Sequence, residues 1–395
     1  MTSLSRNRRE FLRFLAASPL LSQAWSQSQP APLVITSAKD ALSLMDFEPA
    51  ARKAMLPAHW YHVSSGVDDD ATVRANVEGF KHFQLKPRHL VDVSKSDLRT
   101  ELFGRVWDSP IFLCPIGSLI TYHPEGERTV ARAVKAKGTL QILATGTSSP
   151  LADVTQASGR PPWFQLYMPK RWDETEKMVR RVEAGGCPVL VWTIDHLAGR
   201  SHEADSRARL LDTGDCSVCH KDGFAGWAPK GLVAPMHEGI QSGQNPPEAT
   251  WGYVDRLKKL TTMKLVLKGI ETAEDAKLCR EHGVDGIMVS NHGGRATETG
   301  RASIDSLAEV VDAVGNRIPV LVDSGFRRGT DVYKALALGA RMVGIGRPYI
   351  YGLATFGQEG VERVLDILQA ELQLVMRQCG TPTIAQITRA SIIRS

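Results

Sequence analysis

Eight short apolar runs alternate with amphipathic segments after residue 105, and this alternation limits the fold more than any other feature of the chain. Near-continuous apolar runs are typical of parallel strands that are buried on both faces. The runs are Ile111–Pro115, Leu140–Ala144, Trp163–Tyr167, Pro188–Ile194, Lys264–Lys268, Asp285–Ser290, Ile318–Asp323 and Arg341–Gly346. The amphipathic segments include Pro124–Lys137, Asp173–Ala184, Thr272–His282, Ile304–Val314 and Gly329–Leu338. Eight successive strand and helix units predict a closed (β/α)₈ barrel that begins at about residue 106.

The alternative fold is an open doubly wound sheet, which calls for a glycine-rich GxGxxG turn after its first strand. The chain has no such turn there. Residues 33–104 precede the barrel and are predicted to form helices followed by a small β element. Residues 203–250 are predicted to form a long connection after the fourth strand, rich in glycine and proline, and loops of that length are usually functional or mobile. Residues 33–389 are therefore expected to form one domain.

The composition argues against two classes of protein. Hydrophobic residues make up 43% and charged residues 23% of the chain, which is ordinary for a globular protein. No apolar run approaches the ~18 residues that span a bilayer, so no transmembrane helix is expected. Removing residues 1–24, with four arginines and one glutamate, lowers the formal charge from +5 to +2. The nearly neutral remainder gives no indication of nucleic-acid binding.

The N-terminus has the pattern of an export signal. The Arg8-Arg9 pair is followed by a short, weakly apolar stretch and then by Ser22-Gln23-Ala24, which suits a cleavage site. This pattern predicts a twin-arginine signal over residues 1–24 and a periplasmic location. The alternative is a basic amphipathic helix. The twin-arginine route carries folded proteins, so a tightly held cofactor would be loaded before export.

Polar residues follow the carboxyl ends of six predicted strands, where the active sites of such barrels lie. They are Gln165 and Tyr167 after strand three, Thr193 and Asp195 after strand four, Lys268 at strand five, Ser290, His292 and Arg295 after strand six, Asp323 after strand seven and Arg347 after strand eight. Lys268 or Asp323 alone is as readily a capping or paired charge, and a lone histidine in a glycine-rich turn is more often structural. Six such strand ends together favour an active site.

The last two strands also carry a phosphate-binding pattern. Gly325 and Gly346 each precede an arginine, Arg327 or Arg347, and the start of a predicted helix. Backbone N–H groups at a helix N-terminus favour an anion, and many barrels bind phosphate after their last two strands. Arginine then grips the phosphate with two donors. The sequence thus predicts a phosphorylated ligand beside a group of acids and bases.

The motif SNHGGR at 290–295 resembles the signature of the FMN-dependent 2-hydroxy-acid dehydrogenases and oxidases, a family that includes glycolate oxidase and lactate oxidase. The similarity extends from about Ala41 to Arg389. It includes HPEGE (123–127), FQLY (164–167), LKGIETAEDA (267–276) and DSGFRRGTDVYKALALGA with GIGRP (323–348). The resemblance implies a (β/α)₈ barrel that oxidises a 2-hydroxy acid to a 2-oxo acid and passes two electrons to FMN.

The resemblance also implies a role for each matching residue. His292 would be the base, oriented by Asp195, and would take the C2 proton or, while hydride moves, the hydroxyl proton. Arg295 would bind the substrate carboxylate, Tyr167 would hydrogen-bond the hydroxyl, and Lys268 would stabilise negative charge on reduced FMN. The flavin ring would contact Pro115, Ile116, Gly117, Gln165, Thr193 and Ser290, and the ribityl and phosphate groups would contact Asp323, Gly325, Arg327, Gly346 and Arg347.

Three positions depart from the family pattern. His62 stands where the family carries a substrate-binding tyrosine, and His202 stands where it carries a second carboxylate-binding arginine, a role that Arg200 would assume if the loop shifts. Thr145 occupies a position after strand two that is often bulky and controls substrate size. Histidine is mostly uncharged at neutral pH, so the two histidines weaken carboxylate binding. We therefore expect a substrate larger or less acidic than lactate.

The cysteines leave three interpretations open. Cys216, Cys219 and His220 have the spacing of a c-type haem attachment site, for which Met236 would be an axial ligand. A local disulfide suits an oxidising compartment, and a zinc site would be completed by His220 and His237. The other cysteines, which are expected to be buried free thiols, are Cys114, Cys187, Cys279 and Cys379.

Several partners stay open at this stage. In the family that the chain resembles, oxygen, quinones and cytochromes all serve as electron acceptors, and tetramers are common. Export favours a cytochrome or another respiratory acceptor. Two rival functions remain: an exported flavin- or haem-binding electron carrier with an altered substrate site, and a phosphate-ligand barrel enzyme without flavin that uses Lys268 as a Schiff-base amine.

Overall fold

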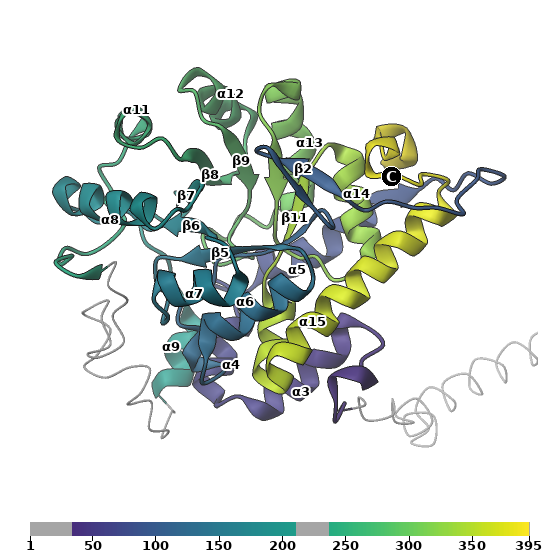
Figure 1. Ribbon diagram of the computed structural model, residues 1–395, viewed down its shortest axis with the longest axis horizontal. Helices are drawn as coiled ribbons and strands as arrows, with labels where there is room; N and C mark the ends of the chain where they lie inside the picture. Colours follow the sequence, from purple (N-terminus) through teal and green to yellow (C-terminus); the bar gives the residue numbers. More distant parts are fainter. Residues whose placement is uncertain (1–33, 211–236, 395) are drawn as a thin grey trace, which may run out of the picture.

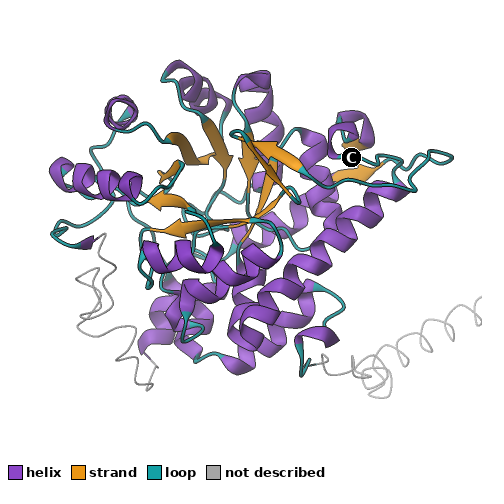
Figure 2. Ribbon diagram, in the orientation of Figure 1, coloured by secondary structure: helices purple, strands orange, loops and turns teal. Residues whose placement is uncertain are grey.

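The computed structural model describes residues 34–210 and 237–394. Eight parallel strands close into a barrel in the order β10-β11-β4-β5-β6-β7-β8-β9, and Figure 2 shows them surrounded by helices. The strands are β4 (Ile111–Leu113), β5 (Leu140–Ala144), β6 (Trp163–Leu166), β7 (Val189–Thr193), β8 (Lys264–Ile270), β9 (Gly286–Val289), β10 (Val320–Val322) and β11 (Met342–Ile345). The barrel closes where β11 pairs with β4, with Val343 opposite Ile111. The predicted (β/α)₈ barrel is confirmed.

Nine described helices follow the strands. They are α6 (Gly126–Ala136), α7 (Leu151–Ser158), α8 (Trp172–Ala184), α9 (Glu203–Leu210), α11 (Trp251–Leu260), α12 (Ala273–Glu281), α13 (Ser303–Val314), α14 (Gly329–Leu338) and α15 (Arg347–Gln378), which is kinked at Phe356 and Gly357. The five predicted amphipathic segments match α6, α8, α12, α13 and α14 within two residues. Thr272 begins α12 as predicted, because its hydroxyl accepts from the Asp275 N–H. None of the helices described is long and apolar enough to cross a membrane.

The segment before the barrel forms helices and small β elements, as expected. It contains η1 (Ala38–Asp40), η2 (Leu44–Asp46), α3 (Phe47–Ala54), α4 (Pro57–Ser64), α5 (Ala71–Glu78), η3 (Gly79–His82), β1 (Phe83–Leu85), β2 (Thr100–Leu102) and β3 (Arg105–Trp107). Short elements elsewhere are η4 (Leu119–Thr121), η6 (Gly315–Arg317), η7 (Ile384–Gln386), η8 (Arg389–Ser391) and β12 (Ile392–Arg394), which pairs with β1. Helices α3 and α6 pack against α15 (Figure 1).

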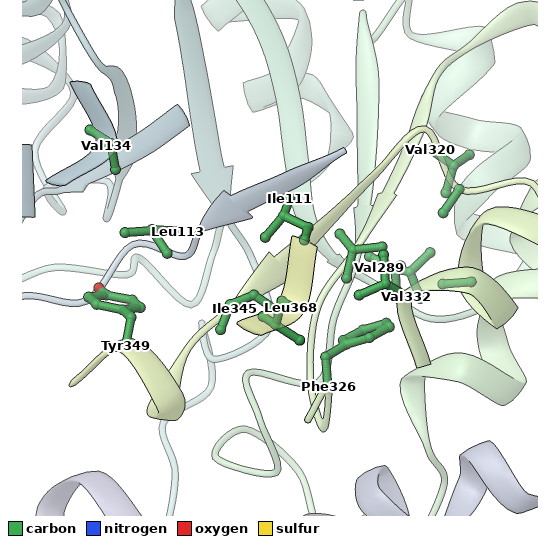
Figure 3. Close-up of a cluster of buried hydrophobic side chains, with 14 of the residues drawn as sticks. Ile111, Leu113, Val134, Val289, Val320, Phe326, Val332, Ile345, Tyr349 and Leu368 are labelled. Atoms are coloured by element: carbon green, nitrogen blue, oxygen red, sulfur yellow. The ribbon is translucent and has the colours of Figure 1, made fainter. Parts of the chain in front are cut away.

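Two apolar clusters form the core. Between the strands and the outer helices lie alternate strand residues such as Ile111 and Leu113, packed with Tyr349 and Leu368 of α15 (Figure 3). Inside the barrel, Leu102 and Trp107 of the β2–β3 hairpin pack on inward-facing strand residues. The hairpin fills the amino-terminal end of the barrel and leaves the carboxyl end for a site.

The connection between β7 and α11 differs from the predicted irregular loop. It begins with the helix α9, which packs on α4 (Figure 1). Its described second part, residues 237–250, docks on the end of β6, where Gln244 bridges to Pro169. Helix α9 has few apolar residues and buries only Asp205 and Ala208, so hydrophobic periodicity does not reveal it.

Candidate active site

A cavity of about 840 Å³ opens at the carboxyl ends of the barrel strands. Its walls are turns that follow the strands, together with the end of β8 and part of α4. The predicted residues that line it are His62, Pro115, Ile116, Gly117, Tyr167, Arg200, Lys268, His292, Arg295, Asp323, Gly325, Arg327, Gly346 and Arg347. The fold therefore gathers most of the predicted site at one place.

His292 lies between an acid and a phenol. Its Nδ1 is 2.9 Å from Asp195 Oδ1 and 3.1 Å from Oδ2, and the Tyr167 hydroxyl is 3.2 Å from Nε2. An ionised carboxylate only accepts, so Nδ1 carries a hydrogen and Nε2 is the nitrogen able to accept a proton. Burial lowers the pKa of His292 well below its usual value, although Asp195 opposes the shift. The imidazole is therefore neutral and basic at Nε2 at neutral pH.

The turn after β9 fixes the position of this imidazole. His292, Gly293 and Gly294 have φ values of 58°, 68° and 76°. The His292 N–H donates to Ser290 Oγ over 3.0 Å. Glycine adopts the left-handed region without cost, whereas histidine in that region is strained, as residues at functional sites often are. The glycine pair thus allows a turn that aims His292 into the cavity.

Lys268 supplies the fixed positive charge of the site. Its Nζ is 3.2 Å from Asp195 Oδ2, 3.3 Å from His292 Nδ1 and 4.0 Å from Asp323 Oδ2. Burial disfavours the charged amine, but Asp195 and Asp323 outweigh it and raise the pKa of Lys268. Burial likewise opposes ionisation of Asp195, yet His292 and Lys268 hold the pKa of this carboxyl below its usual range. Both groups are charged at neutral pH.

The cavity fits a flavin ring on one wall. Gln165, Thr193, Ser290 and Asp195 are outside the cavity lining, and two of their buried polar atoms, Gln165 Nε2 and Thr193 Oγ1, have no hydrogen-bond partner within the described part of the chain. Buried polar atoms are nearly always paired, so a ligand with donors and acceptors is the expected partner. A Cβ at Gly117 would lie 2.9 Å from the Gly146 carbonyl oxygen, so this wall must stay close-packed backbone. Of the residues predicted for the flavin ring, Pro115, Ile116 and Gly117 line the cavity, and the unpaired atoms of Gln165 and Thr193 leave donors and acceptors for a ring.

The residues predicted for the phosphate group, Gly325, Arg327, Gly346 and Arg347, line another part of the cavity. A Cβ at Gly325, where φ is 86°, would overlap the Asn76 carbonyl, which explains the glycine. Arg327 lines the cavity and donates to its neighbour's carbonyl oxygen at 3.0 Å. Arg347 instead donates to the Val63, Gly293 and Ser65 carbonyl oxygens at 2.8–2.9 Å. Three N–H groups of Arg347 are thus paired with backbone carbonyl oxygens. Arg327 has one such contact, so more of its N–H groups are available to a phosphate.

The substrate side differs from the prediction at His202. Arg295 and His62 line the cavity, and Arg295 donates to the His62 and Ser65 carbonyl oxygens. Burial lowers the pKa of Arg295 to about 9, helped by Arg347 and Arg200, so it stays charged. Both ring nitrogens of His202 are buried without a partner in the described chain, and burial lowers its pKa to about 3. His202 lies outside the cavity lining, whereas the exposed Arg200 is part of it.

The expectation for Thr145 is wrong. Its hydroxyl donates to the Gln165 carbonyl oxygen at 2.6 Å and accepts from the Tyr167 N–H at 2.8 Å. Thr145 therefore ties β5 to β6 and does not line the cavity, whereas Ala144 and Gly146 do. Both of these lining residues are small.

Sequence reasoning missed His196 and Asn245. His196 lines the cavity, and the Asn245 amide lies 3.0 Å from its Nδ1. Atoms of Asp195, His196 and His292 that could ligate a metal ion lie within 4.8 Å of one another. A metal ion there would face the Lys268 ammonium, so the cluster suits a base better than a cation. The sequence offered one signal for His196, because it is a titratable residue that directly follows Asp195, the carboxylate predicted to orient the base.

The cysteine predictions are settled in part. Cys114, Cys187, Cys279 and Cys379 are buried free thiols, as expected. Cys216, Cys219, His220 and Met236 lie outside the described residues. His237 is buried, and its Nε2 is 2.6 Å from the Thr145 carbonyl oxygen, so this ring is occupied by a backbone contact.

Comparisons with known proteins agree with the geometry. The profile of the family described as FMN-dependent dehydrogenase matches residues 51–394. The chain is 36% identical over 361 residues to a peroxisomal (S)-2-hydroxy-acid oxidase of Oryza sativa subsp. japonica, which covers 89% of this chain and 96% of that protein. It is 38% identical over 351 residues to 2-hydroxyacid oxidase 2 of Rattus norvegicus, with 87% and 96% covered.

Solved structures show the same likeness. A lactate oxidase of Pediococcus acidilactici superposes with a TM-score of 0.82 at 33% identity, over 90% of this chain and 95% of that one. The flavin-binding domain of baker's yeast flavocytochrome b2 gives 0.80 at 31% identity, over 90% and 87%. The matches span the barrel and its cavity, and they assign FMN as cofactor and a CH–OH group as the site of oxidation. The chain belongs to the FMN-dependent dehydrogenase family, within the group that oxidises 2-hydroxy acids.

Proposed function

We propose that His292 is the base that takes a proton from a 2-hydroxy acid as the acid becomes a 2-oxo acid. The observation that carries this proposal is the chain of contacts from Tyr167 through His292 to Asp195 at the wall of the cavity. FMN, when bound, accepts the two electrons that leave the substrate. Its ring would be held by Gln165 and Thr193, and its phosphate by Arg327.

Each side chain has one task in this proposal. Arg295 pairs with the substrate carboxylate and places the hydroxyl near Tyr167. His292 accepts the proton at Nε2, and Asp195 stabilises the imidazolium that results. Lys268 keeps a positive charge beside these groups and beside the flavin site, where negative charge would otherwise accumulate.

The test is the visible spectrum of the purified protein before and after anaerobic addition of a panel of 2-hydroxy acids. We expect a flavin spectrum that one or more of these acids bleach. We expect His292→Gln to keep the flavin spectrum and lose the bleaching. A flavin that no hydroxy acid reduces would support an electron carrier, and reduction that survives in His292→Gln would remove His292 from the base role.

We further propose that residues 1–24 export the folded domain 33–389 and that its acceptor is a respiratory cytochrome or quinone. The Arg8-Arg9 pattern supports export, and an exported enzyme faces such carriers. Replacing Arg8 and Arg9 by lysine should hold the protein in the cytoplasm. Reoxidation rates with oxygen, a quinone and cytochrome c identify the acceptor, and fastest reoxidation by oxygen would contradict the proposal.

The same spectrum tests the three interpretations of Cys216, Cys219 and His220. A sharp c-type haem band would identify covalent haem. In its absence, thiol counting under denaturing conditions and zinc analysis distinguish the disulfide from the metal site. Light scattering of the same sample checks the tetramer that we propose by analogy with the family.

A further inference from the structure

A second histidine is packed against the proposed base. His196 follows Asp195 directly and its side chain is 8% exposed. Its ring centroid lies 5.0 Å from that of His292, in a T-shaped arrangement, and 4.7 Å from that of Tyr167. Its Nε2 lies 4.0 Å from Asp195 Oδ1 and has no hydrogen-bond partner in the described chain. No role above requires an imidazole here.

The neighbours of His196, Asn245 and Asp195, indicate which ring nitrogen carries the hydrogen. The amide nitrogen of Asn245 lies 3.0 Å from His196 Nδ1. If Nδ1 accepts from this amide, Nε2 carries the hydrogen, 4.0 Å from Asp195 Oδ1, which is too far for a hydrogen bond but close enough for an electrostatic contact. In the reverse tautomer, a bare Nε2 lone pair would face a negative charge, which is unfavourable. The charge of Asp195 therefore selects the tautomer with Nε2–H.

The backbone of Asn245 is held in place, while its side-chain Oδ1 has no hydrogen-bond partner in the described chain. Its backbone N–H donates to the Met168 carbonyl oxygen at 2.8 Å, and the preceding Gln244 bridges to Pro169. Its φ is 58°, a left-handed conformation that asparagine tolerates better than most residues. The described second part of the long connection, residues 237–250, thus places the Asn245 amide beside His196 Nδ1.

We propose that His196, held by Asn245, is a positioning residue that weakens the proton affinity of His292 by directing its Nε2–H at Asp195. The N–H dipole partly offsets the negative charge of Asp195, so this carboxylate stabilises the imidazolium of His292 less. The same dipole places its positive end near His292 and disfavours a second positive charge there. This inference rests on the proposed role of His292 as the base.

Other titratable groups surround Asp195 and His292, and their charges add to any effect of His196. They are Lys268 and Glu271 from β8 and its end, Asp323 after β10, Tyr167 after β6, Arg295 after β9 and Arg200 after β7. Burial lowers the pKa of His196 to about 4. The charge of Asp195 raises this pKa, whereas the charges of Arg200 and Lys268 lower it further. His196 is therefore neutral at working pH, and it acts as a dipole rather than as a charge.

Two substitutions separate this electrostatic role from packing. His196→Phe keeps a ring against Tyr167 and His292 but removes the N–H. We expect it to raise the acid-limb midpoint of the kcat/KM profile by roughly 0.5 to 1 pH unit. Asn245→Asp gives Nδ1 a carboxylate that favours the charged imidazolium, so a full positive charge then faces Asp195. We expect it to lower the midpoint.

A matched variant controls for the loss of a histidine. His282 pairs with Asp255 at 2.8 Å and lies outside the cavity lining, so His282→Phe should leave the midpoint unchanged. Loosened packing alone would not move the midpoint in opposite directions in two variants. The inference is overturned if the His196→Phe and Asn245→Asp profiles coincide with the wild-type profile or shift the same way.

A second measurement does not depend on turnover. In flavin-free protein labelled with ¹³C in its histidine rings, the His292 resonance, identified by its loss in His292→Gln, gives the midpoint directly. We expect the same opposite shifts. If wild-type flavin is reduced but the His292 midpoints do not move, the inference fails and the proposed function stands. If no hydroxy acid reduces the flavin, the proposed function fails, and the resonance still decides the inference.

Discussion

Asp195 has two nitrogen atoms within 3.2 Å and a third at 4.0 Å, and only one of them belongs to the proposed base. A buried carboxylate beside these nitrogen atoms stays ionised, because they stabilise its negative charge in place of water. The charge of Asp195 is therefore available to stabilise protonated His292. Removing that charge tests this directly.

Asp195→Asn keeps the shape of the side chain and removes its charge. We expect the rate of FMN reduction to fall by about 100- to 10 000-fold, the range by which general-base catalysis contributes. Rapid-mixing absorbance measurements at saturating substrate check this. The flavin spectrum must persist, and a near-normal rate in the flavin-loaded Asp195→Asn variant would show that the imidazolium needs no carboxylate.

Gly325 tests the packing under the phosphate side. Gly325→Ala would push a methyl group against the Asn76 carbonyl in a backbone region that L-residues avoid, so we expect loss of stability and weaker FMN binding. Gly104 has a similar φ of 76° but open space around a new Cβ. Gly104→Ala should cost only the conformational penalty, about 1 kcal/mol, and leave FMN affinity unchanged. Fluorescence titration and thermal unfolding compare the two, and equal FMN affinities would count against the steric explanation.

At the residue scale, motif and strand position predicted the side chains that meet in the cavity. His292, Asp195, Tyr167 and Lys268 were identified because each follows a strand, and the fold brings strand ends together. Position along a strand does not reveal which way a neighbouring side chain turns. This is why Thr145 was misassigned and why His202, one loop residue among several, was placed in the site.

Among the elements, the β2–β3 hairpin is the one that most affects the barrel interior. Trp107 is 3% exposed and packs inside the barrel with guanidinium groups of Arg105 and Arg160 each 4.6 Å from its ring centroid. We expect Trp107→Ala to lower the free energy of unfolding by about 3–5 kcal/mol. Urea unfolding followed by circular dichroism measures this.

The same strand offers a control for that substitution. Val106 points away from the barrel and is 59% exposed, so Val106→Ala should change the free energy of unfolding by no more than about 0.5 kcal/mol. Equal effects of the two substitutions would mean that the hairpin does not fill the barrel.

Element prediction worked where burial imposes a pattern. The eight buried strands and the amphipathic helices are set by periods that the sequence displays. Strand β12 and helix α9 were missed. The three residues of β12 are too few to show a period, and α9 buries only Asp205 and Ala208, so it has no apolar stripe. Such elements depend on partners far away in the chain.

At the scale of the whole molecule, buried histidines make stability depend on pH. Burial is the largest cause that lowers the pKa of His62, His123, His196, His202, His237 and His292, with His196 near 4 and His202 near 3. Below about pH 6.5 the unfolded chain binds protons that the folded chain refuses, so stability falls as the pH falls. The depressed pKa values of Asp195 and Asp205 extend the loss below pH 4.

Thermal unfolding between pH 8 and pH 5 checks this expectation. We expect a nearly constant midpoint above pH 7 and a steady fall below pH 6.5. His202→Gln removes one buried imidazole and should flatten the slope. A midpoint independent of pH across this range would mean that these histidines titrate alike in the folded and unfolded chains.

The seam between β4 and β11 joins residue 111 to residue 343. Each strand of a closed barrel forms backbone hydrogen bonds with a strand on both sides. The neighbours of β4 and β11 in the sequence therefore cannot supply all of these bonds. During biosynthesis, β4 must therefore wait until nearly the whole domain has left the ribosome. A nascent chain in that state exposes unpaired strands, so its yield in a foreign host should depend on chaperone supply and growth temperature. A chain truncated before β11 would leave β4 without this partner and would not reach the folded state.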